Sequence, residues 1–183
     1  MSAAEKWADF EMEHAVHRWE AVFRGSPLTV GADDVDDLTL TEMDCNIVLW
    51  GSPATNPHLA TLFAKIQSDS SIRWDDSAIA VGSRTFDAGM HALVMVYPSP
   101  WSPGRYVVVN SCVTHREEDD RTNALQNPKL PDWAVIDLSE APTSDSVGKV
   151  VAADFFDEHW GLKTSSRLAS TVAYLLRIMQ HIH

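Results

Sequence analysis

The sequence lacks the short motifs that identify most nucleotide, zinc and α/β-hydrolase sites. It contains no GxxxxGK[ST] phosphate loop, no GxGxxG dinucleotide motif and no GxSxG nucleophile elbow. Cysteine is scarce, with only Cys45 and Cys112 in 183 residues, and neither has the cysteine or histidine spacing of a zinc site. We therefore expect no cofactor and no metal, and we expect both thiols to be buried and free.

Long apolar runs and positive charge are also in short supply. No run of about 18 apolar residues occurs, so we expect no membrane span. The chain has 14 Lys and Arg against 26 Asp and Glu, a formal net charge of −12. Such a surface repels phosphate backbones, so we expect no nucleic acid partner. Residues 1–7 lack the apolar core of a signal peptide, which predicts a cytoplasmic protein if Met1 is the natural start.

The chain does have enough apolar residues for one packed domain. They make up 45% of the sequence and include seven tryptophans. We predict a single α/β domain over 1–183, with an N-terminal helix within 1–30, a core of strands and helices over 39–160, and a closing helix within 164–183. Apolar side chains recur at helical spacing over 3–24 and again over 165–181.

The stretch NIVLWGSPATNPHLATLF, residues 46–63, reads as a strand, a loop and a helix. The apolar run Ile47–Trp50 is typical of a strand covered on both faces. Asn56 suits a helix N-cap, and Pro57 suits the first helical position. Just before this stretch, residues 39–42 match a capping box (Thr-x-x-Glu) and predict a short helix.

Seven further segments have the composition of strands or hairpins. They are 72–74, 79–81 and 84–86, followed by 93–97, 106–109, 133–138 and 150–155. A proline-rich loop separates the fourth of these from the fifth, and a helical turn is expected over 123–126. Because the central strands are apolar throughout and helices flank them, we predict a three-layer α/β sandwich. Its central sheet would be mixed but mostly parallel, in a flavodoxin-like or Rossmann-like arrangement.

Ligands of open α/β sheets bind beyond the carboxyl ends of the strands. Residues just past the predicted strand ends are therefore the candidate ligand site, and we assign none of them a catalytic role. They are Gly51, Ser52, Thr55, Asn56, Asn110, Ser111, His115, Arg116, Asp157 and His159.

Three interpretations of these residues remain open. The 51–56 loop precedes a helix, so it could bind a small anion, or it could simply connect a strand to a helix. Serine, histidine and aspartate are all present, which also allows a hydrolytic triad with Ser52 as nucleophile. Asp157, Glu158 and His159 could hold a divalent metal, as could the helical pair of histidines at 14 and 17. For both of these groups we expect instead that the polar side chains face water and hold no metal.

Four strings resemble a known module in this order: NIVLWGSPATN, LVMVYPSPWSPGRYVVVNS, PKLPDWAVIDL and GKVVAADFFDEHW. Together, over residues 5–160, they are similar to the C-terminal α/β module that follows the catalytic domain in planctomycete-type prolyl oligopeptidase or esterase-like α/β-hydrolases. The resemblance implies an accessory or interaction module without its own triad. The expected partner is a hydrolase catalytic domain, or a second copy in a homo-oligomer.

Two alternatives stay open beside this reading. One is a stand-alone hydrolase with its active site at the carboxyl ends of the strands, and the other is a domain that binds a small anion or ligand. If the chain belongs to a longer secreted hydrolase, the protein would be exported rather than cytoplasmic.

Overall fold

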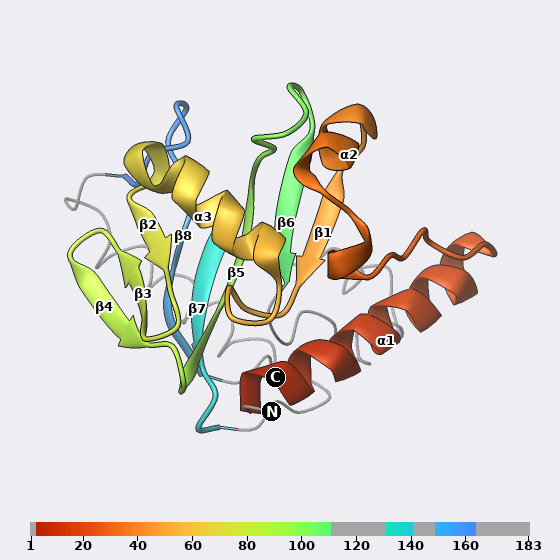
Figure 1. Cartoon of the computed structure of the whole chain (residues 1–183). Coiled ribbons are helices and arrows are strands. Elements are labelled where there is room, and N and C mark those ends of the chain that lie inside the picture. The colour runs from red at the N-terminus through yellow and green to blue at the C-terminus, as the bar shows by residue number, and fades with distance from the viewer. Residues whose placement is uncertain (1–2, 111–130, 141–148, 164–183) are drawn as a thin grey trace.

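The computed structural model describes residues 3–110, 131–140 and 149–163, and it places three helices and eight strands there (Figure 1). The helices are α1 (Ala3–Phe23), α2 (Asp37–Glu42) and α3 (Pro57–Ser70), with a 3-10 turn at Ala32–Asp34. The strands are β1 (Ile47–Trp50), β2 (Ile72–Trp74), β3 (Ala78–Val81), β4 (Arg84–Asp87), β5 (His91–Pro98), β6 (Tyr106–Asn110), β7 (Trp133–Asp137) and β8 (Lys149–Asp154). The expected α/β content is thus confirmed in its coarse form.

The predicted three-layer, mostly parallel sheet is wrong. The described strands form a five-stranded sheet in the order β1-β6-β5-β7-β8 and a separate three-stranded sheet in the order β2-β3-β4. Only the β1–β6 pair is parallel, whereas the β5–β6, β5–β7 and β7–β8 pairs, and both pairs of the small sheet, are antiparallel. The arrangement is therefore mixed α/β dominated by strands, and it is not Rossmann-like.

The length of the connections explains the error. Residues 99–105 join β5 to β6 directly, and Ser99 N donates a 2.8 Å hydrogen bond to the carbonyl of Arg105 across this loop. A parallel pair needs a crossover of about a dozen residues or more, so a connection this short permits only an antiparallel hairpin. The apolar run of β5 reflects burial on both faces and carries no information about strand direction.

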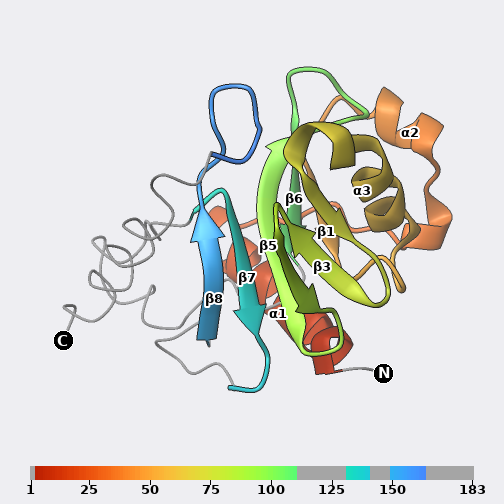
Figure 2. The ribbon, with the colours of Figure 1, turned by 90° about the vertical axis from the view of Figure 1, so that its left-hand side faces the viewer.

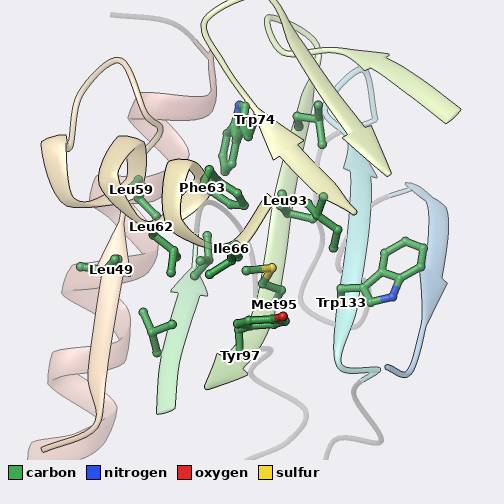
Figure 3. Close-up of a cluster of buried hydrophobic side chains, with 14 of the residues drawn as sticks. Leu49, Leu59, Leu62, Phe63, Ile66, Trp74, Leu93, Met95, Tyr97 and Trp133 are labelled. Carbon is green, nitrogen blue, oxygen red and sulfur yellow. The ribbon is translucent and has the colours of Figure 1, made fainter. Parts of the chain in front are cut away.

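The core lies between α3 and the larger sheet. Figure 3 shows Leu62, Phe63 and Ile66 of α3 pointing toward Leu93 and Met95 of β5. These side chains are all buried, and each buried side chain of this size contributes about 2 kcal/mol through apolar area removed from water. Figure 2, turned by 90° from Figure 1, shows α3 and the small sheet together on the same side of the larger sheet.

The other face of the larger sheet carries a smaller apolar cluster. Ala92 of β5 and Ile136 of β7 are buried there, and Trp7 from the start of α1 packs against them. Alternate residues of a strand point to opposite faces, so Ala92 and Leu93 take part in different clusters. Only the first part of α1 is held in this way, and its later turns extend past β1 (Figure 1).

Helix α2 begins earlier than the capping-box pattern predicts. Its N-cap is Asp36, whose carboxylate accepts a 2.8 Å hydrogen bond from Thr39 N and a 2.7 Å hydrogen bond from Thr39 Oγ1. An aspartate three residues before Thr39 reaches the free N–H groups and adds a negative charge at the positive end of the helix dipole. Thr39 is therefore the third helical residue and not the cap.

Most of the helices and strands predicted from the sequence lie in the described residues, and a few lie outside them. The predicted helices over 3–24 and from Pro57 to about Ile66, and all eight strands, are present, and their ends differ from the prediction by at most four residues. The closing helix over 165–181, the helical turn over 123–126 and Cys112 lie outside the described residues. Cys45 is a free thiol and is half-buried rather than fully buried. No helix in the described ranges combines the length and apolar character needed to cross a membrane.

Truncation of Leu62 tests the position of the core. This side chain is 0% exposed, so Leu62→Ala should lower the free energy of unfolding by about 2–5 kcal/mol through lost burial and the cavity left behind. Leu38→Ala makes the same chemical change at a side chain that is 65% exposed and should cost less than about 0.5 kcal/mol. Urea denaturation of both variants measures the difference, and equal costs would contradict this core.

Candidate functional site

Some of the predicted site residues lie at the carboxyl ends of two neighbouring strands of the larger sheet. Trp50 and Asn110 are register partners at the ends of the parallel strands β1 and β6, so the 51–56 loop begins beside Asn110. Gly51, Ser52, Thr55 and Asn56 all belong to this loop and connect β1 to α3 (Figure 1). These strand ends hold five of the ten candidate residues that the sequence predicts: Gly51, Ser52, Thr55, Asn56 and Asn110.

The other described candidate residues do not lie at this end of the strands. Asp157 and His159 lie in a turn after β8, and the ring of Trp160 in the same turn is 5.7 Å from the rings of both Tyr97 and Tyr106. Tyr97 is the last residue but one of β5 and Tyr106 begins β6, so this turn lies at the opposite end of these strands from Asn110. The expected positions Ser111, His115 and Arg116 fall outside the described residues.

The 51–56 loop is a tight turn closed by its own hydrogen bonds. The carbonyl of Ser52 accepts from Thr55 N at 3.0 Å and from Asn56 N at 2.8 Å, and Ser52 N donates to Thr55 Oγ1 at 3.0 Å. Gly51 has φ +98°, and a Cβ there would lie 2.7 Å from Thr55 Oγ1. Only glycine suits this position, because it tolerates both the left-handed backbone and the close approach.

Asn56 joins the end of β1 to the start of α3. Its side-chain amide donates to the Trp50 carbonyl at 3.0 Å, and its Oδ1 accepts from His58 N at 3.0 Å. Leu59 N donates to the Asn56 carbonyl at 3.0 Å, and Pro57 has no N–H. The first backbone donors of α3 are therefore already engaged. An anion at this helix end would have to displace a built-in cap.

The hydroxyl of Ser52 has no imidazole among its described contacts. Its described partner is Thr55 Oγ1, 3.3 Å away, and this hydroxyl is not a base that could take its proton. A serine nucleophile needs a histidine or an equivalent base within hydrogen-bond reach. The described geometry at this edge supplies a strand-to-helix connection and gives no support to a nucleophile.

His58 was not singled out from the sequence, yet it organises the neighbouring segment. Its buried ring places Nε2 2.9 Å from the Ala32 carbonyl, while Nδ1 lies 3.7 Å from Asp37 Oδ1. The ring of Trp101 packs against it edge-on. A histidine at the second position of a helix that begins with Asn-Pro gives no sequence signal for this contact, because Ala32 is 26 residues away.

Asp37 sits beside this contact and holds a charge pair. Burial alone would raise the pKa of Asp37, but the 3.1 Å hydrogen bond from Lys65 Nζ and the positive charge of Lys65 outweigh it, so the pKa is lowered. The carboxylate is therefore ionised at neutral pH. This pair fastens α2 to α3.

Asp157 has a structural role in the turn after β8. Its Oδ1 accepts from His159 N at 2.8 Å and from Gly161 N at 2.9 Å, and these two hydrogen bonds, that of Gly161 first, lower the pKa of the carboxyl group. Trp160 has φ +63° in this turn, and its ring packs on Phe156 and Tyr97. The strained backbone is explained by this aromatic contact.

The metal hypotheses find no support in the described structure. No group of three or more histidine, cysteine, aspartate or glutamate side chains is arranged to hold an ion in the ranges that are described. Asp157 Oδ1 accepts two backbone hydrogen bonds of its own turn, which is a structural role for that oxygen. The helical histidines 14 and 17 belong to no such group either.

A groove that the sequence did not predict runs beside β1. It has a volume of about 630 Å³ and lies between α1, the segment 30–35, β1 and the start of α3. Its walls are mostly apolar, and among the described lining residues Asp9 is the one acidic side chain. The described lining residues are Ala8, Asp9, Met12, Val30, Gly31, Ala32, Val35, Leu40, Ile47, Val48, Leu49, Trp50, Gly51, Thr55, Asn56 and His58.

Comparisons with known proteins give no match. No protein family, no curated protein and no solved structure matches this chain.

Substitution of Asn56 separates its two roles. Asn56→Ala removes both the cap and the donor to Trp50, and should lower the free energy of unfolding by about 1–3 kcal/mol. Asn56→Ser keeps a capping oxygen for the N–H groups of α3 but removes the donor to the Trp50 carbonyl, so its cost should be smaller than that of alanine. Urea denaturation at neutral pH measures both. An alanine variant as stable as the parent would show that Asn56 does not hold β1 and α3 together.

Acid titration tests the Asp157 turn. Because the folded pKa lies below the ordinary value of 3.8, the stabilisation is complete above that value and is lost as pH falls through the folded pKa. The free energy of unfolding should therefore fall more steeply between about pH 4 and about pH 2 in the parent protein than in Asp157→Asn, which has no carboxylate to titrate. Parallel curves for the two proteins would contradict the assignment.

Proposed function

We propose that this chain is a non-catalytic interaction module that acts beside a serine hydrolase of the peptidase or esterase type. The observation that carries the proposal is the state of the candidate catalytic groups in the described structure. The side chains of Asn56 and Asp157 accept from backbone N–H groups of their own turns, and the described partner of the Ser52 hydroxyl is the Thr55 hydroxyl. The two turns lie at opposite ends of the strands of the larger sheet. The resemblance to a hydrolase-associated module supplies the class of partner.

Exposed apolar side chains on α1 support a role in docking. Trp19 is 47% exposed and Phe23 is 64% exposed, and their rings lie 4.5 Å apart on the last turns of the helix. Val22 and the following Leu28 are also exposed. Aromatic residues of this kind are enriched at protein interfaces and supply much of the binding energy there. We name Trp19, Val22 and Phe23 the α1 ridge.

The alternatives receive less support. Among the described residues no base is hydrogen-bonded to Ser52, as a stand-alone hydrolase would need. The described backbone donors at the start of α3 are engaged, which opposes anion binding there. A homo-oligomer would bring together two chains that each carry a formal net charge of −12, which opposes association at low ionic strength. A hydrolase domain with a complementary surface would not meet this cost.

The proposal predicts no catalysis by the isolated chain. Short-chain nitrophenyl esters and peptide arylamides should be hydrolysed no faster than in buffer, and Ser52→Ala and Ser111→Ala should leave that background unchanged. Chromogenic assays of the parent and both variants measure this. Turnover that depends on either serine would overturn the non-catalytic reading.

The same proposal predicts binding to a hydrolase through the α1 ridge. The probe is the serine hydrolase catalytic domain encoded in the same reading frame or next to it, titrated with this chain in a calorimeter. Trp19→Ala combined with Phe23→Ala should weaken binding about tenfold or more. Met90→Ala, at a side chain that is similarly exposed but belongs to another part of the fold, should change binding less than twofold. Absence of binding by the parent chain would count against the partner class.

A further inference from the structure

The groove beside β1 opens onto the free edge of a sheet. β1 is the outermost strand of the five-stranded sheet that the structure describes, and it pairs there with β6 alone. An outer strand leaves backbone N–H and C=O groups on its far side, which can pair with another extended chain. All four residues of β1, Ile47–Trp50, line the groove, so this far side faces a cavity. The side chain of Val48 is 49% exposed at this position.

We propose that the groove binds an extended, lysine- or arginine-bearing peptide segment of the partner, which adds as a further strand beside β1. The proposal rests on the interaction function proposed above and names the chemistry of one contact in it. Addition of a strand to a free sheet edge is a common mode of peptide recognition, in which main-chain hydrogen bonds give affinity and side-chain pockets give specificity. β1 spans four residues, about 13 Å, so it can pair with a segment of about that length.

Apolar walls provide places for the side chains of such a segment. Met12 from α1, Val30 from the following segment and Leu40 from α2 surround the strand edge. Alternate side chains of an added strand would point toward α1 on one face and toward α2 and α3 on the other. A volume of about 630 Å³ is within the range of sites that bury a ligand.

The charge around the groove determines the kind of segment. Asp9 lines it, and the exposed Asp33 and Asp34 follow directly after its lining residues Gly31 and Ala32. No lysine or arginine is found among the described lining residues. A cationic segment is therefore attracted and an acidic one repelled. A second copy of this chain, with its net charge of −12, fits the groove poorly for the same reason.

The test uses three synthetic probes of one length, each labelled with fluorescein and followed by fluorescence anisotropy. The first is Lys-Val-Lys-Val-Lys-Val, the second replaces each lysine with glutamate, and the third carries N-methyl groups on alternate backbone nitrogens of the first. The first should bind in about 0.15 M salt and weaken in about 0.5 M salt. The glutamate and N-methyl probes should each bind at least tenfold more weakly, because one reverses the charge and the other removes strand pairing.

Matched variants locate the binding. Asp9→Lys should weaken the lysine probe about fivefold. Asp76→Lys, an identical charge change at an exposed aspartate between β2 and β3, should weaken it less than twofold. Backbone NMR signals of Val48 and Gly31 should shift on titration, whereas those of Arg84 and Thr85 in β4 should not. All these measurements use the full chain.

Several results would overturn the groove proposal. They are no binding of the lysine probe by the parent chain, equal binding of the lysine and glutamate probes, full binding of the N-methyl probe, and equal effects of Asp9→Lys and Asp76→Lys. Concentration-dependent dimers that shift the Val48 signal without peptide would assign the groove to a second copy and would also overturn it. Hydrolase binding with an inactive groove would leave the interaction function standing, whereas serine-dependent turnover would remove that function independently.

Discussion

The packing of α3 on the larger sheet is the contact on which the rest of the structure depends. Leu62 and its buried neighbours close one face of β1, β5 and β6, and the small sheet continues directly from the end of the same helix. Asn56 sets where this helix begins, because its one amide side chain donates to the last carbonyl of β1 and accepts from His58 N, the first N–H group of α3. The 51–56 loop therefore links β1 to α3, and its content of glycine, serine, threonine and asparagine follows from that geometry.

Local signals in the sequence predicted the elements well but not their assembly. Periodicity located α1, and Asn56 and Pro57 located the start of α3, because caps and periodic faces are properties of neighbouring residues. Strand direction is not local, and burial on both faces made β5 look like a strand of a parallel sheet. The short 99–105 connection was the one feature that could have excluded this, since it allows only a hairpin.

The candidate site was predicted in part for the same reason. The 51–56 loop and Asn110 do share one end of the sheet, because β1 and β6 are the one parallel pair among the described strands and Trp50 is the register partner of Asn110. Asp157 and His159 were assigned to the same end of the sheet because the carboxyl ends of parallel strands all lie on one side. The chain after β8 instead turns back beside Tyr97 and Tyr106. His58 and the groove escaped prediction because they depend on the contact of Ala32 with α3, which no pattern of neighbouring residues encodes.

The two sides of β1 differ in whether their backbone groups can still bind another chain. On its inner side β1 is paired with β6, and beyond its end Ser52 N, Thr55 N, Asn56 N and His58 N are already hydrogen-bonded within the loop and the first helical turn. A buried polar group that is already satisfied gains little from a ligand, because binding must first break an existing hydrogen bond. The outer side of β1 differs, since its backbone faces a groove with apolar walls and an acidic rim. Association there would add hydrogen bonds and bury apolar surface together, so this edge, and not the polar loop, is the part of the fold best suited to bind another chain.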